Sequence, residues 1–512
     1  MQSVSNAWKT AQQLNVVPLS QVEVSYKIVD RNMQTATATD NGHWTYSDVS
    51  QILTTQYGYA NYTTMEHTSW LLNGSRQVLA DTPSQPFGYV SSAMSQTDGT
   101  FSTNPIVTIT FAGVNTTVLP GMTITWSTAF DEFATGFIVR SYNGATLLNT
   151  TTVTDNTDIM PFVSITLANY DKIEIEITDW CLPTHRARME QIVFGQVEVF
   201  TNIGLISYKH SSSADLLSFN LPKNAITFEL SNVNGEWNPF NPTGMYQYLA
   251  ERQEISVRYG YDINGSTEWI KGGTFWLSGW NTPQNGITAS FEARDLIVFM
   301  ENPYVPTAGT YTLKQLAESA FTQSNIPTDE NGNNRWNIDS SLSNISKSIT
   351  ASFNHTCAEV IQLCADAAQC VMYQDRDGVM NIVPLDTTLT DYEITRFNSY
   401  SNAEYELSKE LKSVNVNDGQ GTATNSTTGE IQLVKNELIP NATVAGNVAT
   451  WVKDCLKNRR TVSGEYRADP RLDVLDYITL ENKYATNTVY ITTIDYTYNG
   501  AFKGNYEGRV YS

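Results

Sequence analysis

Short runs of alternating apolar and polar residues are the feature that most constrains how this chain can fold. The run Lys172-Ile-Glu-Ile-Glu-Ile177 places three isoleucines on one face of an extended segment and charged residues on the other. Val107–Phe111 and Gly136–Arg140 show the same two-residue period, and Tyr142-Asn143-Gly144 supplies a turn signal. This period is typical of half-buried strands, and several short strands separated by turns predict a β-sandwich.

Helical patterns are confined to the middle and the last part of the chain. Thr312 with Gln315, and Thr356 with Glu359, each fit a capping box ahead of an amphipathic segment. The turn Asp375–Gly378 lies between two apolar runs and predicts a hairpin. We therefore expect a fold that is mainly β with a small α+β part.

Two stretches of the chain share one order of predicted elements, which indicates a weak internal duplication. Residues 254–294 and 476–509 each contain a strand, a break, a strand ending in alternating aromatics, an Asn-Gly turn and a last strand ending near Glu-x-Arg. Any two hairpins share some of this order, so the signal has low specificity by itself. It suggests two copies of one barrel-like unit, and two copies per chain would let a trimer present a six-fold ring.

The charge of the chain excludes several classes of partner. Its 512 residues carry a net charge of −21, which repels nucleic acid and anionic membranes. The nearest approach to a basic run, residues 457–460, lies at the end of a predicted helix, where it complements the helix dipole. Five cysteines are too few for a disulfide framework. We expect no nucleic-acid partner, no membrane span and no secretion signal.

Segments in the second half resemble bacteriophage tail hub proteins, a family that includes baseplate hubs and the N-terminal regions of tail-associated proteins. The segments are Tyr466–Asp473 followed by Asp476–Leu480, and Ala358–Cys364 leading to the Asp-Arg-Asp-Gly hairpin. The resemblance covers roughly residues 200–512 and part of the first 80. It implies two tail-tube-like β-barrels with an α/β insertion, assembled as a trimer at the tail tip. The chain ends at Ser512, so we expect no C-terminal peptidase or lysin.

Residues 85–200 are expected to form an insertion. The end of this segment, Trp180–Gly195, resembles the closing strands of galactose-binding-like sandwiches, in which loops at one end contact sugars. An aromatic ring can stack on a sugar while Arg and His donate to its hydroxyls, so the carbohydrate-binding candidates are Trp180, His185, Arg186 and Arg188. The alternative is that Trp180 packs in the sandwich and the arginines pair with acids.

Other arrangements of reactive residues favour structural readings. His355 and the cysteines Cys357, Cys364 and Cys370 lack the spacing of a zinc site, and Cys357 and Cys364 fall on an apolar helical face. Cys181 with His185 has no third, orienting residue. Carboxylates are abundant, so a glycosidase pair stays open, although adjacent Asp131 and Glu132 would point apart on a strand.

These observations lead to one predicted organisation and function. The expected segments are 1–84 (N-terminal part and first strands of barrel 1), 85–200 (sandwich), 201–304 (rest of barrel 1), 305–390 (α/β insertion), and 391–512 (a helix and barrel 2, with a loop at 417–429). We expect a structural virion protein of a phage tail tip, not an enzyme, with no catalytic residues, metal or cofactor. Its partners would be further copies of itself, other tail proteins and a possible host surface glycan. A carbohydrate-binding adhesin, a distal-tail ring protein and, more remotely, a cell-wall hydrolase are the alternatives.

Overall fold

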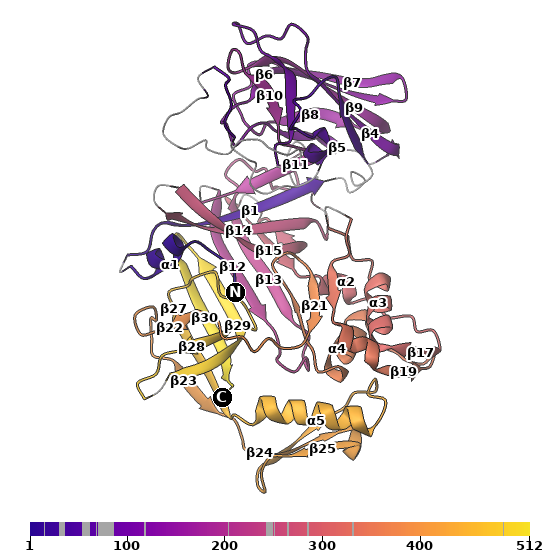
Figure 1. Cartoon of the computed structure of the whole chain (residues 1–512), viewed down its shortest axis with the longest axis vertical. Coiled ribbons are helices and arrows are strands. Elements are labelled where there is room, and N and C mark those ends of the chain that lie inside the picture. The colour runs from indigo at the N-terminus through magenta and orange to yellow at the C-terminus, as the bar shows by residue number, and fades with distance from the viewer. Residues whose placement is uncertain are drawn as a thin grey trace. The chain divides into compact units, whose positions relative to one another are not determined.

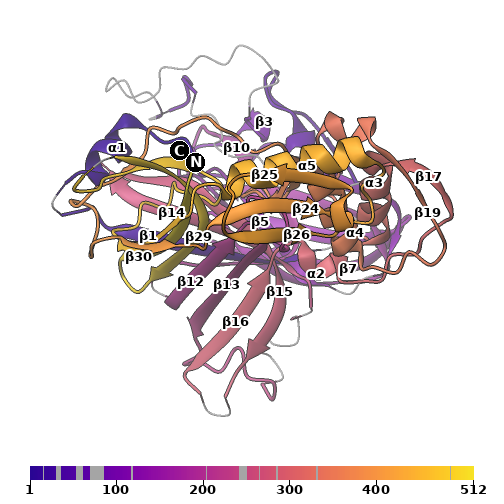
Figure 2. The ribbon, with the colours of Figure 1, turned by 90° about the horizontal axis from the view of Figure 1, so that it is seen from below.

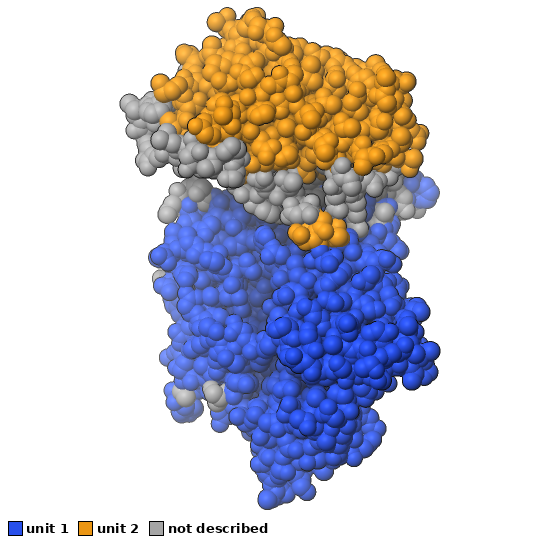
Figure 3. Space-filling model, turned by 45° about the vertical axis from the view of Figure 1, so that its right-hand side comes forward, with its two compact units in different colours: residues 1–26, 199–327, 334–512 blue, residues 27–198, 328–333 orange. Residues whose placement is uncertain are grey.

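Two units divide the chain in the computed structural model (Figure 3). Unit 1 comprises Met1–Tyr26, Val199–Pro327 and Asn334–Ser512, and unit 2 comprises Lys27–Glu198 and Thr328–Asn333. The structure describes residues 1–14, 16–29, 36–53, 62–67, 69, 86–116, 119–202, 204–241, 249, 251–263, 266–283, 286–329, 332–484 and 486–511. Strands predominate in both units and helices are few (Figure 1), which confirms the predicted fold class, mainly β with a small α part.

Unit 2 is built from two larger sheets with a shared apolar core. The first sheet has the order β2-β4-β9-β6-β7 and the second contains β11-β5-β8, while β3 and β10 form a separate pair. The strands are β2 (Thr37–Asp40), β3 (Tyr89–Met94), β4 (Ile106–Asn115), β5 (Leu119–Thr125), β6 (Ala134–Asn143), β7 (Thr146–Val153), β8 (Phe162–Leu167), β9 (Tyr170–Trp180), β10 (Arg186–Met189) and β11 (Gln191–Phe200). A short 3-10 helix, η2 (Val49–Leu53), completes the unit.

The core of unit 2 follows from the two-residue period of its strands. The three isoleucines of β9, Ile173, Ile175 and Ile177, are fully buried and share one core with Met122 and Ile124 of β5. Two sheets that bury alternating residues against each other form a sandwich, as the sequence predicts.

The sandwich begins earlier than the predicted start at residue 85. β2 pairs antiparallel with β4, with Ala38 opposite Ile109 and Thr39 opposite Thr108, so residues 37–40 belong to a sheet of unit 2. The predicted boundary between residues 84 and 85 lies outside the described residues.

Unit 1 contains two six-stranded segments, which we call repeat A and repeat B. Repeat A consists of β1 (Ser20–Val29), β12 (Leu205–Ser213), β13 (Lys223–Ser231), β14 (Glu254–Ile263), β15 (Ser266–Asn281) and β16 (Thr288–Arg294). Repeat B consists of β22 (Glu393–Ile394), β23 (Glu404–Leu407), β27 (Arg460–Tyr466), β28 (Tyr477–Leu480), β29 (Asn487–Tyr498) and β30 (Phe502–Val510). The first helix, α1 (Asn6–Gln12), packs its buried Trp8 against Tyr261 of repeat A.

The strands of the two repeats pair in the same order. Repeat A runs β12-β13-β16-β15-β14-β1, part of which is seen in Figure 2, and repeat B runs β23-β27-β30-β29-β28-β22. In each case the second strand along the chain is outermost, followed by the third, sixth, fifth, fourth and first. One difference is that β1 pairs antiparallel with β14, whereas β22 pairs parallel with β28. The shared order supports the duplication expected from the sequence, while closure of each repeat into a barrel stays a prediction.

Local irregularities also recur at equivalent places in the two repeats. The fifth strand is bulged between Leu277 and Gly279 in repeat A and between Ile491 and Thr493 in repeat B. At the bulge, Ser278 Oγ donates to the carbonyl of Glu292 (3.2 Å), and Thr492 Oγ1 donates to the carbonyl of Glu507 (3.3 Å). A bulge is a position-specific feature of a sheet, so two matching bulges are stronger support for duplication than strand order alone.

The two repeats are joined edge to edge within the chain. β12 of repeat A pairs antiparallel with β29 of repeat B, from Tyr208 opposite Tyr498 to Ser213 opposite Thr493. As the outermost strand of repeat A, β12 would have one free edge, and β29 covers it. The backbone groups of β12 are therefore paired on both sides, with β13 and with β29. The result is one continuous sheet through both repeats.

Two insertions accompany the repeats. The first contains α2 (Ile297–Met300), β17 (Gly309–Thr312), α3 (Leu313–Gln323), β18 (Trp336–Ile338), η4 (Ser340–Asn344), β19 (Ser346–Ile349), α4 (Cys357–Ala367), β20 (Val371–Gln374) and β21 (Met380–Val383). Both predicted capping boxes are present, at Thr312 with Gln315 on α3 and at Thr356 with Glu359 on α4. The short strands and helices confirm that this part is a mixed α and β segment.

The second insertion lies inside repeat B and replaces the loop expected at 417–429. It contains β24 (Leu411–Val416), η5 (Asn417–Gly419), β25 (Gly421–Thr424), β26 (Glu430–Val434) and α5 (Ala442–Leu456). Gly421 explains how β25 packs on α5, because an added Cβ would lie 2.2 Å from the backbone carbon of Ala445. Among the described residues, no helix is both long and apolar enough to cross a bilayer.

Candidate functional site

The candidate sugar-binding residues lie on and between β9 and β10 of unit 2. Trp180 ends β9, while Arg186 and Arg188 lie on β10. Trp180 and Arg188 are each 2% exposed and His185 is 1% exposed, whereas Arg186 is partly exposed. The sequence therefore placed these four residues near one another, but the structure turns three of them inward.

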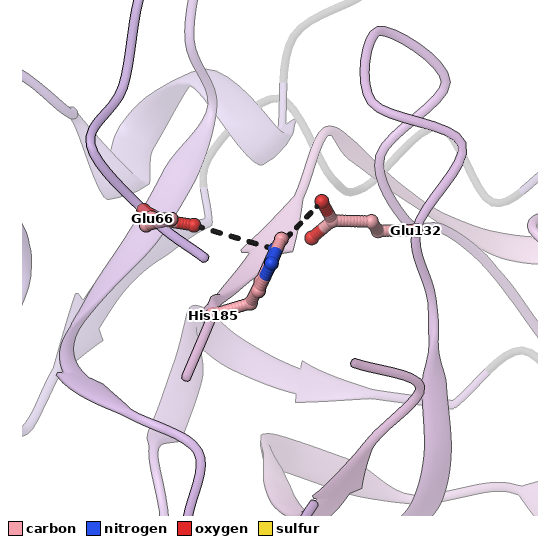
Figure 4. A group of neighbouring side chains, drawn as sticks. All are labelled: Glu66, Glu132 and His185. Carbon is pink, nitrogen blue, oxygen red and sulfur yellow. Dashed lines mark hydrogen bonds and ion pairs between the residues drawn. The ribbon is translucent and has the colours of Figure 1, made fainter. Parts of the chain in front are cut away.

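Two glutamates that lie far away in the sequence meet these buried side chains, and Figure 4 shows both of them beside His185. Arg188 Nη1 lies 2.8 Å from Glu132 Oε2, and its Nη2 lies 2.5 Å from Glu66 Oε2. Trp180 Nε1 donates to Glu132 Oε2 (3.0 Å). His185 Nδ1 lies 2.9 Å from Glu132 Oε1 and 3.6 Å from Glu66 Oε2. We call Glu66, Glu132, His185 and Arg188 the buried charge network.

The hydrogen-bond partners of His185 favour the imidazolium form of its ring. Its Nδ1 faces the carboxylate of Glu132, and its Nε2 donates to the carbonyl of His67. A carboxylate and a carbonyl can only accept, so both contacts are satisfied when both ring nitrogens carry protons. Burial disfavours the charge, but the bond to Glu132, the attraction of that carboxylate and the bond to His67 outweigh burial and raise the pKa of His185. The network then holds two positive and two negative groups.

The same atoms have the composition of a metal site, but the arrangement does not fit one. Glu66, Glu132 and His185 each offer a ligand atom, and these atoms lie within 4.8 Å of one another. A metal ion would need the Nδ1 lone pair that now carries a proton, and it would lie beside the guanidinium of Arg188. Since Arg188 already pairs with both carboxylates, the group is an ion-pair network that holds residues 62–67 against β10.

The geometry favours packing over sugar binding for the candidate residues. Trp180 lies edge-on to Trp126 in the core, with 6.0 Å between ring centroids, so its face is not open for stacking. Arg186 Nη1 donates to the carbonyl of Ser91 (2.8 Å), and Nη1 also contacts the carbonyl of Ser92. These contacts agree with the alternative in which Trp180 packs in the sandwich and the arginines pair with acids. Carbohydrate binding by this set stays a prediction.

The reactive residues considered elsewhere in the sequence have structural surroundings. Cys357 and Cys364 are buried in the core on α4. His355 contacts two glutamates, with its Nδ1 3.3 Å from Glu359 Oε2 and its Nε2 against Glu437. Cys181 accepts a hydrogen bond from the backbone N–H of Phe133. These placements give each group a packing or pairing role.

A second polar cluster lies where the two repeats meet, and the sequence did not single it out. Arg376, at the tip of the β20–β21 hairpin, is 5% exposed. Its Nη1 donates to the carbonyl of Lys271 in repeat A (2.8 Å). Its Nη2 donates to the carbonyl of Leu472 (2.9 Å) and its Nε to Asp473 Oδ2 (2.9 Å), both just before β28 of repeat B. One side chain of the insertion therefore binds both repeats, and the Asp375–Gly378 turn predicted from the sequence positions it.

His210 belongs to the same joint and is neutral. Its Nε2 donates to Asn224 Oδ1 (2.6 Å), and its Nδ1 accepts from the hydroxyl of Tyr259 (2.8 Å), which also bonds to the hydroxyl of Tyr208 (2.7 Å). Burial lowers the pKa of His210 to about 4. The joint is thus a satisfied polar network surrounded by aromatic rings, and such networks specify one arrangement of the parts they connect.

A cavity of about 600 Å³ in unit 1 is lined by residues that include Asp215, Gln362, Cys455 and Arg509. Asp215 accepts from backbone N–H groups of its own loop, at Leu217 (3.0 Å) and Asn220 (3.2 Å). Arg509 Nη1 donates to the carbonyl of Asn458 (3.2 Å). Asp215 and Arg509 are therefore engaged in holding the wall together.

Comparisons with known proteins find distant similarity to solved structures. No protein-family model matches the chain, and no curated protein matches it. Similar solved structures include the 43 kDa tail protein of prophage MuSo2 from Shewanella oneidensis, with 14% identity, 61% of this chain and 95% of that chain covered, and a TM-score of 0.44. Prophage tail protein gp18 from Listeria monocytogenes has 15% identity, with 62% and 92% covered and a TM-score of 0.42. A tail protein from Neisseria meningitidis has 10% identity, with 62% and 94% covered and a TM-score of 0.40.

Proposed function

We propose that this chain is a structural protein of a bacteriophage tail, a hub that connects the tail tube to the tip or to the receptor-binding apparatus. The hub would be a homotrimer located at the tail tip of the virion. The segments around Tyr466–Asp473 and Ala358–Cys364 resemble this class of protein, and the duplicated sheet of unit 1 is the main structural support for the proposal.

The observation that most supports this proposal is that two copies of one six-stranded repeat are joined edge to edge by β12 and β29. A chain with two equivalent repeats contributes two positions to a ring, so three chains would contribute six. Such a ring would join a three-fold object to a six-fold tube, which is the task of a hub. The buried residues of unit 1 support a static role, because Arg376 and His210 use their polar atoms to fix the joint.

The symmetry of the assembled protein tests this proposal. Purified full-length chain should have three times the mass of one 57.1 kDa copy by light scattering. Class averages from electron microscopy should then show three-fold symmetry with six similar lobes. A monomer in every preparation, and in the virion, would sink the proposal, and a six-copy ring would favour the distal-tail alternative.

A carbohydrate-binding adhesin is the second candidate, and it can coexist with a hub. It is less supported because three of the four candidate residues are buried and paired. A glycan array with the full-length chain tests the binding, and an assay on purified cell walls tests the hydrolase alternative. Binding that is unchanged by substitution of Arg186, the partly exposed member, would place any sugar site elsewhere.

A further inference from the structure

The segment of β29 in repeat B that pairs with β12 has an equivalent in β15 of repeat A. No described strand pairs with that equivalent segment. β28 pairs with β29 over Asn487–Tyr490, and β12 then pairs with the same side of β29 from Thr493 onward. In repeat A, β14 pairs with β15 up to Trp276, and the segment beyond it, Ser278–Asn281, has no paired strand on that side among the described residues. We call Ser278–Asn281 the open edge of β15.

Repeat B offers the matching donor. β23 corresponds to β12, because each is the second strand of its repeat and pairs with the third. β12 is covered on both sides, but β23 ends the strand order of the sheet and pairs only with β27 among the described strands. Unpaired strand edges present a row of free N–H and C=O groups that template pairing with another chain.

We propose that β23 of one copy pairs antiparallel with the open edge of β15 in a second copy of this chain. This contact repeats between chains the joint that β12 and β29 make within a chain. It rests on the proposed function only in that both require self-assembly. A contact between two different surfaces is heterologous, so repeated use of it builds a closed ring or an open filament.

The observed joint fixes the register of the proposed one. Ser211 and Glu406 are equivalent, because their partners Ala225 and Thr461 lie opposite the matched arginines Arg294 and Arg509. Ser211 lies opposite Asp495 in β29. The first residue beyond the bulge is Thr493 in β29 and Gly279 in β15. Asp495 and Asn281 each lie two residues further on, so they are equivalent. Glu406 of one copy is therefore expected opposite Asn281 of the next.

The same register places Leu407 opposite Trp280, and burial supports this pairing. Their equivalents in the observed joint, Ser212 and Ile494, are 4% and 1% exposed. Leu407 is 69% exposed and Trp280 is partly exposed in a single chain. A large apolar side chain thus lies uncovered at the position that the joint would bury, which is typical of an interaction surface.

Further exposed apolar residues lie at the end of the sheet where β15 leads into β16. Ile287 follows it in the β15–β16 loop and is 68% exposed. The backbone N–H of Asn232 donates to the carbonyl of Ile287 (2.7 Å), which brings Val233, 73% exposed, to the same tip of the sheet.

A cysteine pair tests the register in the full-length chain. Glu406 and Asn281 are both exposed, so Glu406→Cys with Asn281→Cys should leave the fold intact. Cα atoms directly opposite in an antiparallel pair are about 4.5–5.5 Å apart, within the range that a disulfide spans. Oxidation should give a ladder of linked copies on a non-reducing gel, which a reductant collapses. Each single variant, and the mismatched pair Asn281→Cys with Tyr484→Cys, should give no ladder.

A charge substitution tests the apolar contact with a matched control. Leu407→Asp should convert at least half of the assembled material to single copies, as measured by mass. Leu433→Asp should leave assembly unchanged, because Leu433 is 65% exposed but belongs to β26 of the second insertion and to neither strand of the proposed joint. If the wild type assembles while the double-cysteine variant gives no ladder and Leu407→Asp assembles normally, the edge assignment is wrong and the hub proposal stands. If the wild type never assembles, both fail.

Discussion

Replacing Arg188 by methionine probes the buried charge network most directly. The guanidinium is the shared partner of Glu66 and Glu132, at 2.5 and 2.8 Å, and all three side chains are about 2% exposed. Methionine keeps most of the volume that packs against Phe130, whose ring centroid lies 4.3 Å from the guanidinium carbon. The substitution therefore removes a charge without opening a large cavity, and it leaves two buried carboxylates beside the single positive charge of His185.

The expected cost follows from that imbalance. Removing one partner of a buried ion pair typically costs about 3–5 kcal/mol, because the remaining charge stays desolvated. For a unit of roughly 150–250 residues, each kcal/mol lowers Tm by about 2–4 °C, so the transition of unit 2 should fall by about 6–20 °C. Calorimetry of the full-length chain measures this, because the two units are expected to unfold in separable transitions.

Two companion variants make the result interpretable. Arg186→Met removes hydrogen bonds to the carbonyls of Ser91 and Ser92 at a partly exposed site, which should cost about 1 kcal/mol. Adding Glu66→Gln to Arg188→Met should recover part of the loss, because it removes the unpaired negative charge. A transition for Arg188→Met within about 2 °C of the wild type would refute the charge network as a stabilising element of unit 2.

Three further predictions concern the same two clusters. The raised pKa of His185 means that its contribution is complete below the unfolded value of about 6.5 and is lost as the pH rises through the folded value. Unit 2 should thus lose stability on the alkaline side, and His185→Gln should flatten that slope in pH-dependent thermal scans. The pKa of His210, lowered to about 4, has the opposite effect. The free energy of unfolding of unit 1 should therefore fall by up to about 3 kcal/mol as the pH drops from about 6.5 toward 4. His210→Gln should remove that dependence. Arg376→Met should destabilise unit 1 by about 2–4 kcal/mol, whereas Asp377→Asn, which breaks the neighbouring exposed pair with Lys271, should cost under about 1 kcal/mol; equal effects would contradict the special role of Arg376.

The strands of unit 2 and the helix starts were predictable because their signals are local. Ile173, Ile175 and Ile177 alternate with charged residues, and that period alone determines which face is buried. A capping box likewise spans four residues, so Thr356 and Glu359 identify the start of α4 without any tertiary contact.

The buried charge network could not be predicted, because its members are far apart along the chain. Glu66 and Arg188 are separated by 122 positions, and no local pattern pairs them. The sequence showed an aromatic residue followed by His and Arg, which is compatible with a sugar site and with a packed interior alike. Only the fold decides between the two, by placing the acid of Glu132 between Trp180 and His185.

Arg376 illustrates a different limit. The sequence signal at Asp375–Gly378 was interpreted as a turn, and the structure has a turn there, with the backbone N–H of Gly378 donating to the carbonyl of Asp375 (3.1 Å). Turn propensity describes the backbone, however, and says nothing of where the side chain at the tip points. The contacts of Arg376 with repeats A and B depend on how the insertion packs against both, which is long-range information.

A backbone detail ties the duplication to the joint between repeats. Arg252 and Leu475 precede the fourth strands of the two repeats, and both have positive φ, 64° and 66°. This conformation costs a residue with a Cβ about 1 kcal/mol or more, so its recurrence needs a cause. In each repeat the N–H of this residue donates to a carbonyl of the fifth strand just before the bulge, Leu277 or Ile491, at 2.7 Å. The strained residue therefore ends the pairing of the fourth strand there, which leaves the next segment of the fifth strand open. In repeat B that segment is occupied by β12, and in repeat A it is the open edge of β15. Retention of the same strained turn in both repeats is expected if both edges receive a strand, and replacing Arg252 by glycine should relieve the strain and raise stability without weakening assembly.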